Sequence, residues 1–177
     1  MLADVGVVVR GEAPGVGEET REPDPPTRAV ELALRKARAV ALRHPEAIVI
    51  GADQVVTDGV DIWGKPLDPA DHLRRLQGMR GASHQLVTGW AVLHAGGEHI
   101  GHCTTTMYVR DDLTDDELRD YVATGEGSGC AGGYAAEQRG AFLFERVDGD
   151  WNNVIGLPLY PILGVLRGLG WRFGEGS

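Results

Sequence analysis

Apolar residues recur along this chain with two different periods, so both helices and strands are predicted. Apolar positions three and four residues apart follow Thr27, which suits a helix N-cap behind Pro25-Pro26, and this pattern runs to His44-Pro45. Ala47–Ile50 then reads as a strand with apolar residues on both faces, as in a sheet covered by helices. Further helices are predicted over residues 69–79, 114–124 and 158–169, and further strands over residues 5–9, 85–93, 99–109 and 140–147.

Helices alternate with strands throughout, and no internal repeat or linker divides the chain. Thr114 followed by Glu117 has the spacing of a capping box, which marks the start of one of these helices. At 177 residues the chain is long enough for one sizeable core. The pattern predicts a single α/β domain over residues 1–177, with a mixed twisted sheet flanked by helices.

Net charge, apolar run length and cysteine content limit which partners, cellular location and metal sites are expected for this protein. A formal charge of −9 argues against general binding to nucleic acid or to an anionic membrane, both of which favour a basic face. No apolar run is long enough to span a membrane and no leader pattern begins the chain, so the reduced cytoplasm is the expected location. Two cysteines make neither a disulfide framework nor a zinc signature, and a hydrophilic strand edge explains the cluster His99, His102 and Cys103 better than a metal site does.

The segment Ile48–Pro66 carries the most informative chemistry. It delivers one carboxylate, Asp53, past Gly51 at the end of a strand, and Lys65 follows on a Gly-Lys-Pro turn. Of the 17 basic residues only Lys36 and Lys65 are lysines, which suggests that a compact ammonium group is needed at those places. A carboxylate near ammonium groups can hold a divalent cation and a phosphate chain together. Chance retention of two surface lysines is the alternative.

Other candidate residues are weaker when each is taken singly. Glu18 and Glu19, in an irregular loop long enough to be functional, could join Asp53 around a metal ion, although loop glutamates are commonly just solvated. Glu137 sits in the Gly-rich turn Gly132–Glu137, where its carboxylate could face a ligand or water. Asp53 itself could be no more than a turn residue that caps the end of a strand.

The order of these pieces resembles the Maf family of nucleoside triphosphate pyrophosphatases over nearly the whole chain. The matching segments are Lys36-Ala37, Gly51-Ala52-Asp53, Gly64-Lys65-Pro66, His84 to Gly89, Leu113-Thr114-Asp115, Tyr121 to Gly125, Ala131 to Tyr134, Asn153 and Gly156 to Leu159. The resemblance implies an α/β fold with a long cleft and hydrolysis of a nucleotide between its α and β phosphates. The products would be the nucleoside monophosphate and pyrophosphate, and a homodimer is the default assembly.

The resemblance also implies a role for each candidate residue. Asp53 would position and deprotonate the attacking water, directly or through a bound Mg²⁺ or Mn²⁺ ion. Lys36 and Lys65 would neutralise charge on the triphosphate as pyrophosphate leaves. Glu18 matches the family's loop carboxylate at the metal, and an apparent length difference of one residue makes Glu19 its rival.

One departure from the family concerns the N-terminus. Family members begin with a strand and a Ser-x-x-Arg loop that resembles a phosphate cradle, whereas Met1–Asp4 matches the far end of the helix that follows that loop. Either the start is assigned too late or the protein is truncated and impaired. If the protein is truncated and impaired, the alternative function belongs to another class. The protein would then bind nucleotides without turnover, or it would restrain septum formation. No Gly-x-Ser-x-Gly elbow or Walker loop supports any other hydrolase.

Two positions bear on the choice of base. The two positions are the residue directly after the aspartate and a residue in the later Gly-rich turn. Thr at the first and Gln at the second resemble the family's dTTP/UTP branch, whereas Gln and Glu resemble the 7-methyl-GTP branch. This chain has Gln54 and Glu137. Because N7-methylated guanine is cationic and presents two donors, Glu137 could accept a bidentate, charge-assisted pair. The sequence therefore predicts 7-methyl-GTP as substrate, with the pyrimidine nucleotides dTTP and UTP as the alternative.

Overall fold

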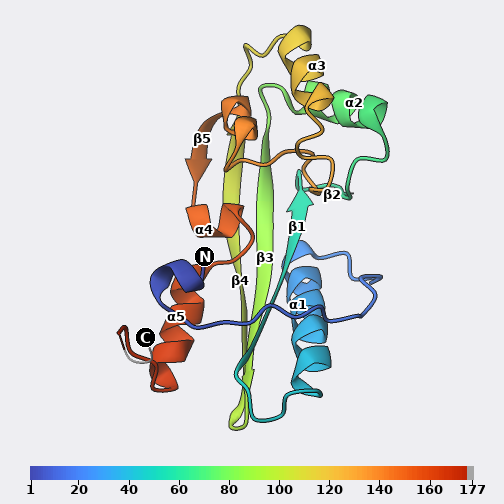
Figure 1. Ribbon diagram of the computed structural model, residues 1–177. Coiled ribbons are helices and arrows are strands. Elements are labelled where there is room, and N and C mark those ends of the chain that lie inside the picture. Colours follow the sequence, from blue (N-terminus) through green and yellow to red (C-terminus); the bar gives the residue numbers. More distant parts are fainter. Residues whose placement is uncertain (175–177) are drawn as a thin grey trace. The chain divides into compact units, whose positions relative to one another are not determined.

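The computed structural model describes residues 1–174, in which five strands form one sheet in the order β2-β1-β3-β4-β5 (Figure 1). The elements in chain order are the 3-10 helix η1 (Ala3–Val5), α1 (Pro25–Ala41), β1 (Val49–Thr57), β2 (Ile62–Trp63), α2 (Pro69–Met79), β3 (Ser83–His94), β4 (Gly97–Val109), α3 (Asp115–Ala123), the 3-10 helix η2 (Arg139–Leu143), β5 (Phe144–Asp148), α4 (Trp151–Val154) and α5 (Leu159–Gly168). The predicted α/β class, with helices flanking a sheet, is confirmed.

The sheet is antiparallel, not mixed as expected. β1 and β2 pair antiparallel, as do β4 and β5, and only residues 95–96 separate β3 from β4. A connection this short can join only antiparallel neighbours, because parallel neighbours need a crossover of a dozen or more residues. The strand predicted over residues 5–9 is also absent, since Ala3–Val5 forms a turn of 3-10 helix and residues 7–23 have no regular structure.

The described chain forms two compact units. The first contains residues 1–54, 88–103 and 156–174, and the second contains residues 55–87 and 104–155. β1, β3 and β4 each contribute residues to both units. The single domain over residues 1–177 stays a prediction, as does its long cleft, and residues 175–177 lie outside the described residues.

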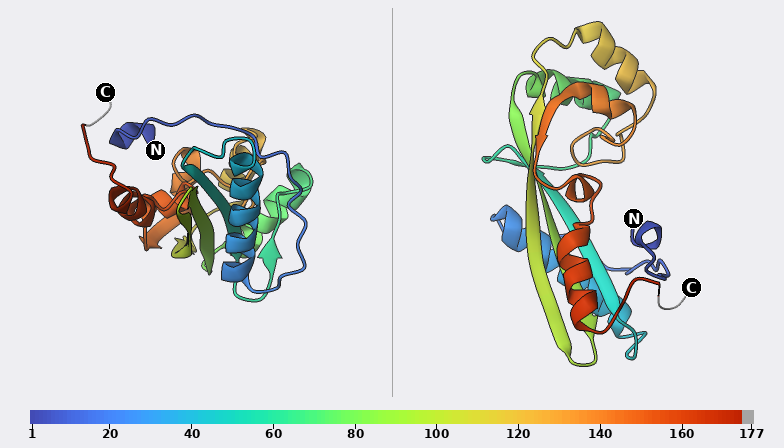
Figure 2. Two further views of the ribbon diagram at one scale, coloured as in Figure 1. Left: turned by 90° about the horizontal axis from the view of Figure 1, so that it is seen from below. Right: turned by 90° about the vertical axis from the view of Figure 1, so that its left-hand side faces the viewer.

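In the first unit, α1 and α5 cover opposite faces of the strands (Figure 2). Alternate residues of a strand point to opposite faces, and the sequence of β3 follows this rule. Val92 packs in one buried cluster with Ile162 of α5, whereas Ala91 packs in another with Ala37 of α1. The strands are therefore apolar on both faces, as the sequence predicts for the middle of a covered sheet.

The start of α1 differs from the prediction. The helix begins at Pro25 and its cap is Asp24, whose side chain accepts a hydrogen bond from the Thr27 backbone N–H at 3.0 Å. Thr27, the predicted cap, lies inside the helix. The two prolines do not stop the helix because the first turn has no use for their missing N–H groups, and proline's fixed φ already suits a helix.

The second unit has its own buried cluster beneath α2 and α3. The predicted bounds of α2 are confirmed, and so is the capping box of α3, in which Thr114 and Glu117 exchange side-chain to backbone hydrogen bonds. The core residues of this unit include Val56, Leu76, Met79, Leu86, Met107, Val109, Leu113, Leu118, Tyr121, Tyr134, Ala136, Leu143 and Val154.

The strand predicted over residues 140–147 begins later, because its first part forms η2. The Gly140 backbone N–H donates to Glu126 Oε1 at 2.8 Å and is thereby unavailable to a strand partner. A Cβ atom at Gly140 would also lie 2.6 Å from the Ala135 carbonyl oxygen, so the chain turns tightly here before β5 starts at Phe144.

Within residues 1–174, no helix has both the length and the apolar character needed to cross a membrane.

Candidate active site

Asp53 faces α1 because of the two-residue period of β1. Val49 packs in the same buried cluster as Ala37 of α1, and Gly51 lies two residues further along the same face. A Cβ atom at Gly51 would lie 2.6 Å from the Ala33 carbonyl oxygen and 2.8 Å from the Ala37 Cβ atom. The glycine therefore lets the helix approach the strand closely, and Asp53 follows on that face.

Lys36 joins two of the predicted carboxylates. Its Nζ atom lies 2.5 Å from Asp53 Oδ1 and 2.6 Å from Glu18 Oε1. The side chains of Lys36 and Asp53 are 20% and 11% exposed, whereas that of Glu18 is 63% exposed. Three residues from a helix, a strand and a loop thus meet at one partly buried ammonium group.

The pKa values at this site are shifted by burial and by the ion pairs. Burial raises the pKa of Asp53 above its ordinary value, and the hydrogen bond and charge of Lys36 offset only part of that rise. Burial acts to lower the pKa of Lys36, but its hydrogen bonds to Asp53 and Glu18 outweigh that effect and leave the pKa raised. Asp53 is therefore a stronger proton acceptor than an ordinary aspartate, beside a lysine that stays charged.

The loop that carries Glu18 is held by two arginines of α1 and one in the turn that follows it, none of which was singled out from the sequence. Arg28, Arg35 and Arg43 each donate to two backbone carbonyl groups of residues 13–22. The two carbonyls that Arg35 binds, at 3.0 and 2.9 Å, belong to the residues on either side of Glu18. The seven-residue spacing of Arg28 and Arg35, which places them on one helix face, was the available signal.

Glu18, not its rival Glu19, is the carboxylate that reaches Lys36. The Glu19 carboxylate folds back toward its own loop, since a Cβ atom at Gly17 would lie 2.7 Å from Glu19 Oε2. Within residues 1–174 no group of three or more histidine, cysteine, aspartate or glutamate side chains is arranged to hold a metal ion. Asp53 and Glu18 are two carboxylates, which is the number that Mg²⁺ commonly uses when substrate phosphates supply further oxygens.

Gln54 has a partner that the sequence did not reveal. Its side-chain amide donates from Nε2 to Thr88 Oγ1 at 2.9 Å, and Thr88 is fully buried on β3. Residues that face each other on neighbouring strands commonly fix one another's rotamers through such bonds. The orientation of Gln54 therefore depends on Thr88, which lies in the segment His84 to Gly89 that resembles the family.

In the second unit, Lys65 and Glu137 lie near the same thiol. Burial raises the pKa of Cys130, the charge of Glu137 raises it further, and the charge of Lys65 lowers it. Both charged groups therefore lie close enough to Cys130 to affect its ionisation. Their roles as phosphate-binding and base-selecting residues stay predictions.

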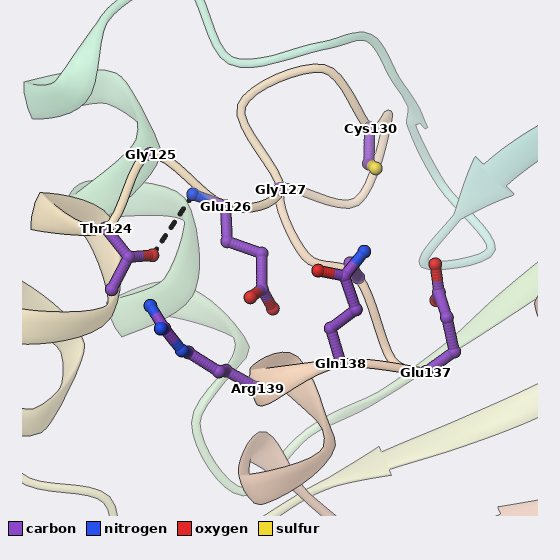
Figure 3. A pocket seen from close by; sticks show the side chains of 9 residues that line it. Thr124, Gly125, Glu126, Gly127, Cys130, Glu137, Gln138 and Arg139 are labelled. Atoms are coloured by element: carbon purple, nitrogen blue, oxygen red, sulfur yellow. Dashed lines mark hydrogen bonds between the residues drawn. The ribbon is translucent and has the colours of Figure 1, made fainter.

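Glu137 and Cys130 line an open pocket of about 850 Å³ in this unit (Figure 3). The Glu126 carboxylate in this pocket accepts hydrogen bonds from the Tyr121 hydroxyl at 3.1 Å and from the Gly140 backbone N–H at 2.8 Å. The residues that line the pocket are Thr124, Gly125, Glu126, Gly127, Cys130, Ala135, Glu137, Gln138 and Arg139. The sequence identified Glu137 here but not Glu126, whose bond from Gly140 joins residues fourteen positions apart in the chain.

Buried aromatic and histidine side chains fix the Gly-rich turn at residues 132–134. His72 Nε2 contacts the Gly133 carbonyl oxygen at 2.5 Å, and His84 Nε2 contacts the Tyr134 hydroxyl at 2.6 Å. Burial lowers the pKa of His84 to about 4, so the ring is neutral at physiological pH. The tyrosine hydroxyl can then donate to the unprotonated ring nitrogen.

Comparison with known proteins places this site in a family context. The family model described as Maf-like protein matches residues 1–169. A dTTP/UTP pyrophosphatase of Deinococcus radiodurans is 41% identical, covering 96% of this chain and 87% of that protein. A dTTP/UTP pyrophosphatase of Symbiobacterium thermophilum is 38% identical, covering 100% of this chain and 91% of that protein.

These matches decide part of what the sequence predicted. The Maf resemblance and the expected class, a nucleoside triphosphate pyrophosphatase, are confirmed, whereas the predicted preference for 7-methyl-GTP receives no support and the pyrimidine alternative fits the relatives better. Two residue positions suggested the first substrate, but similarity over nearly the whole chain favours the second. This chain belongs to the Maf-like protein family.

Proposed function

We propose that this protein hydrolyses dTTP and UTP between the α and β phosphates, releasing the nucleoside monophosphate and pyrophosphate. Its curated relatives support this substrate class, since several that match over most of the chain are named dTTP/UTP pyrophosphatase. The observation that carries the chemistry is the pairing of Lys36 with Asp53 at 2.5 Å in a partly buried setting.

Asp53 acts as the general base in this proposal. The ion pair with Lys36 favours the ionised form of Asp53, and burial raises the pKa of the carboxyl above its ordinary value, so the carboxylate accepts one proton of the attacking water. The water oxygen bonds to phosphorus as the α–β phosphoanhydride bond breaks. Lys36 and Lys65 stabilise the negative charge that develops on pyrophosphate, because ammonium groups aimed at a leaving phosphate act most strongly in the transition state.

Asp53 and Glu18 would hold a divalent ion, Mg²⁺ or Mn²⁺. Both carboxylates converge on Lys36, and they supply oxygen atoms, the ligand type that these ions prefer. When bound, the ion would contribute Lewis-acid charge at the phosphates. Removing divalent ions with a chelator should then abolish turnover, and adding Mg²⁺ or Mn²⁺ back should restore it.

The decisive experiment compares hydrolysis of dTTP, UTP, GTP and 7-methyl-GTP under one set of conditions. We expect the highest kcat/KM for dTTP and UTP, with Asp53→Asn as the inactive control. A preference for 7-methyl-GTP would refute the pyrimidine assignment and restore the prediction made from Gln54 and Glu137. Nucleotide binding without turnover of any substrate would favour the impaired, regulatory alternative.

The homodimer and the cytoplasmic location stay predictions. Light scattering of the purified protein would measure the first.

A further inference from the structure

Arg75 of α2 contacts two loops that lie far apart in the sequence. Its Nη1 atom donates to the Gly64 carbonyl oxygen and to the Ala131 carbonyl oxygen, the second at 2.6 Å. The side chain is only 19% exposed, and its other terminal nitrogen lies 3.7 Å from Asp71 Oδ2. All four residues belong to the second unit.

Each of these loops carries a candidate site residue beside the contact. Gly64 directly precedes Lys65, and Ala131 directly follows Cys130 in the turn that leads to Glu137. The Lys65 loop is held on its other side as well, because the Leu67 backbone N–H donates to Asp71 Oδ2 at 3.1 Å. Helix α2 therefore fixes the backbone on both sides of Lys65.

The chemistry of this contact favours arginine over any other residue. Two carbonyl oxygens that approach one point repel each other unless a donor lies between them. A guanidinium group satisfies both from one planar, permanently charged group and keeps a second nitrogen for Asp71. A lysine keeps the charge, but its nitrogen is one bond closer to the backbone than arginine Nη1, so it does not reach the same position between the two carbonyls, and it has no second nitrogen for Asp71.

We propose that Arg75 is a positioning residue, which sets the distance between Lys65 and the Cys130–Glu137 segment by binding one carbonyl group of each loop. The inference rests on the proposed function only in assigning Lys65 and Glu137 to the nucleotide. The neighbouring Arg74 shows the contrast, because its side chain is 67% exposed and its Nη2 atom lies 3.3 Å from Asp71 Oδ1.

The first test measures this spacing without any substrate. In a Cys103→Ser background, which leaves Cys130 as the only cysteine, the pH dependence of thiol alkylation gives the pKa of Cys130. The charge of Lys65 lowers that pKa, so Lys65→Ala should raise it. Arg75→Lys keeps a positive charge but has a shorter side chain, so it should raise the pKa of Cys130 toward the Lys65→Ala value, and Arg74→Lys should leave that pKa unchanged.

The double variant makes the test specific. If Arg75 acts by holding Lys65 in place, adding Arg75→Lys to Lys65→Ala should produce no further rise in the pKa of Cys130. A wild-type pKa in Arg75→Lys, or a rise that adds fully to that of Lys65→Ala, would overturn the proposal. Thermal unfolding of each variant checks that the thiol is read in folded protein.

The second test concerns turnover. Arg75→Met should lower kcat/KM for dTTP on the order of tenfold, since misplacing a charge-assisted contact costs at least that much, and the loss should shrink in a Lys65→Ala background. Equal losses in both backgrounds would contradict positioning through Lys65. If no variant or wild type hydrolyses a nucleotide while the Cys130 titration behaves as expected, the proposed function fails and the positioning role stands.

Discussion

Substituting alanine for Gly51 should damage both stability and turnover, although it adds only one methyl group. The site depends on how closely α1 approaches β1, because Lys36 and Asp53 lie on these two elements and meet at 2.5 Å. A Cβ atom at Gly51 would lie 2.6 Å from the Ala33 carbonyl oxygen and 2.8 Å from the Ala37 Cβ atom. Neither neighbour is a flexible side-chain end that can rotate away.

The size of the effect follows from these distances. Ordinary contacts begin at 3.4 Å, so α1 must move by roughly 0.8 Å to accommodate the new atom. Overpacking of this kind typically costs about 1–3 kcal/mol of unfolding free energy. A displacement approaching 1 Å between catalytic groups costs up to about a hundredfold in rate, and we expect a loss of ten- to a hundredfold in kcat/KM for dTTP.

Urea unfolding and steady-state kinetics measure the two effects. Gly164→Ala is the matched control, because Gly164 lies in α5 of the same unit and a Cβ atom there would meet nothing within 4 Å. That variant should stabilise the protein slightly, since alanine favours a helix by about 0.5–1 kcal/mol over glycine. Gly51→Ala with unchanged stability and wild-type turnover would refute the close-approach argument.

Three further predictions concern titratable side chains. Asp53→Asn should lower turnover of dTTP about a hundredfold or more. The wild-type kcat/KM should fall as pH drops through the raised pKa of Asp53, and the pH–rate profile of the variant should lack this acidic decline. Lys36→Ala and Lys65→Ala should each lower kcat/KM for dTTP and UTP alike, and arginine replacements should restore it only partly; normal turnover in both alanine variants would make them ordinary surface lysines. Because burial depresses the pKa of His84 from 6.5 to about 4, its contribution to stability is complete above pH 6.5 and is lost as pH falls toward 4, by about 3 kcal/mol. Urea titrations at several pH values should show this loss in wild type and a smaller loss in His84→Gln.

The periodic parts of the fold were predictable from the sequence, and the exceptions have local causes. The bounds of α2 and the capping box of α3 were predicted correctly because their signals lie within one turn of helix. The Pro25-Pro26 pair was predicted to lie before the helix, although proline suits the first turn of a helix and α1 begins at Pro25. The strand predicted over residues 140–147 failed at its start because Glu126, fourteen residues away from Gly140, binds that glycine's N–H.

The candidate site was predictable to a similar degree. Sequence order pointed to Asp53, Lys36 and Glu18, and the structure brings these three together. The sequence could not identify the loop residues that Arg35 and Arg75 bind, because these arginines donate to backbone carbonyl groups, which every residue possesses. A contact to the backbone leaves no signature in the identity of the partner residue.

The choice of base shows the same limit. The prediction from Gln54 and Glu137 assumes that each side chain contacts the base independently. The Gln54 amide donates to Thr88, however, so the orientation of Gln54 also depends on Thr88. Thr88 is fully buried on β3, and replacing it with valine would remove the acceptor while keeping the shape of the side chain. If Gln54 contributes to base choice, Thr88→Val should change the ratio of kcat/KM for dTTP to that for 7-methyl-GTP without contacting either nucleotide. An unchanged ratio, in a variant whose unfolding free energy shows that it is folded, would mean that base selection does not pass through Gln54.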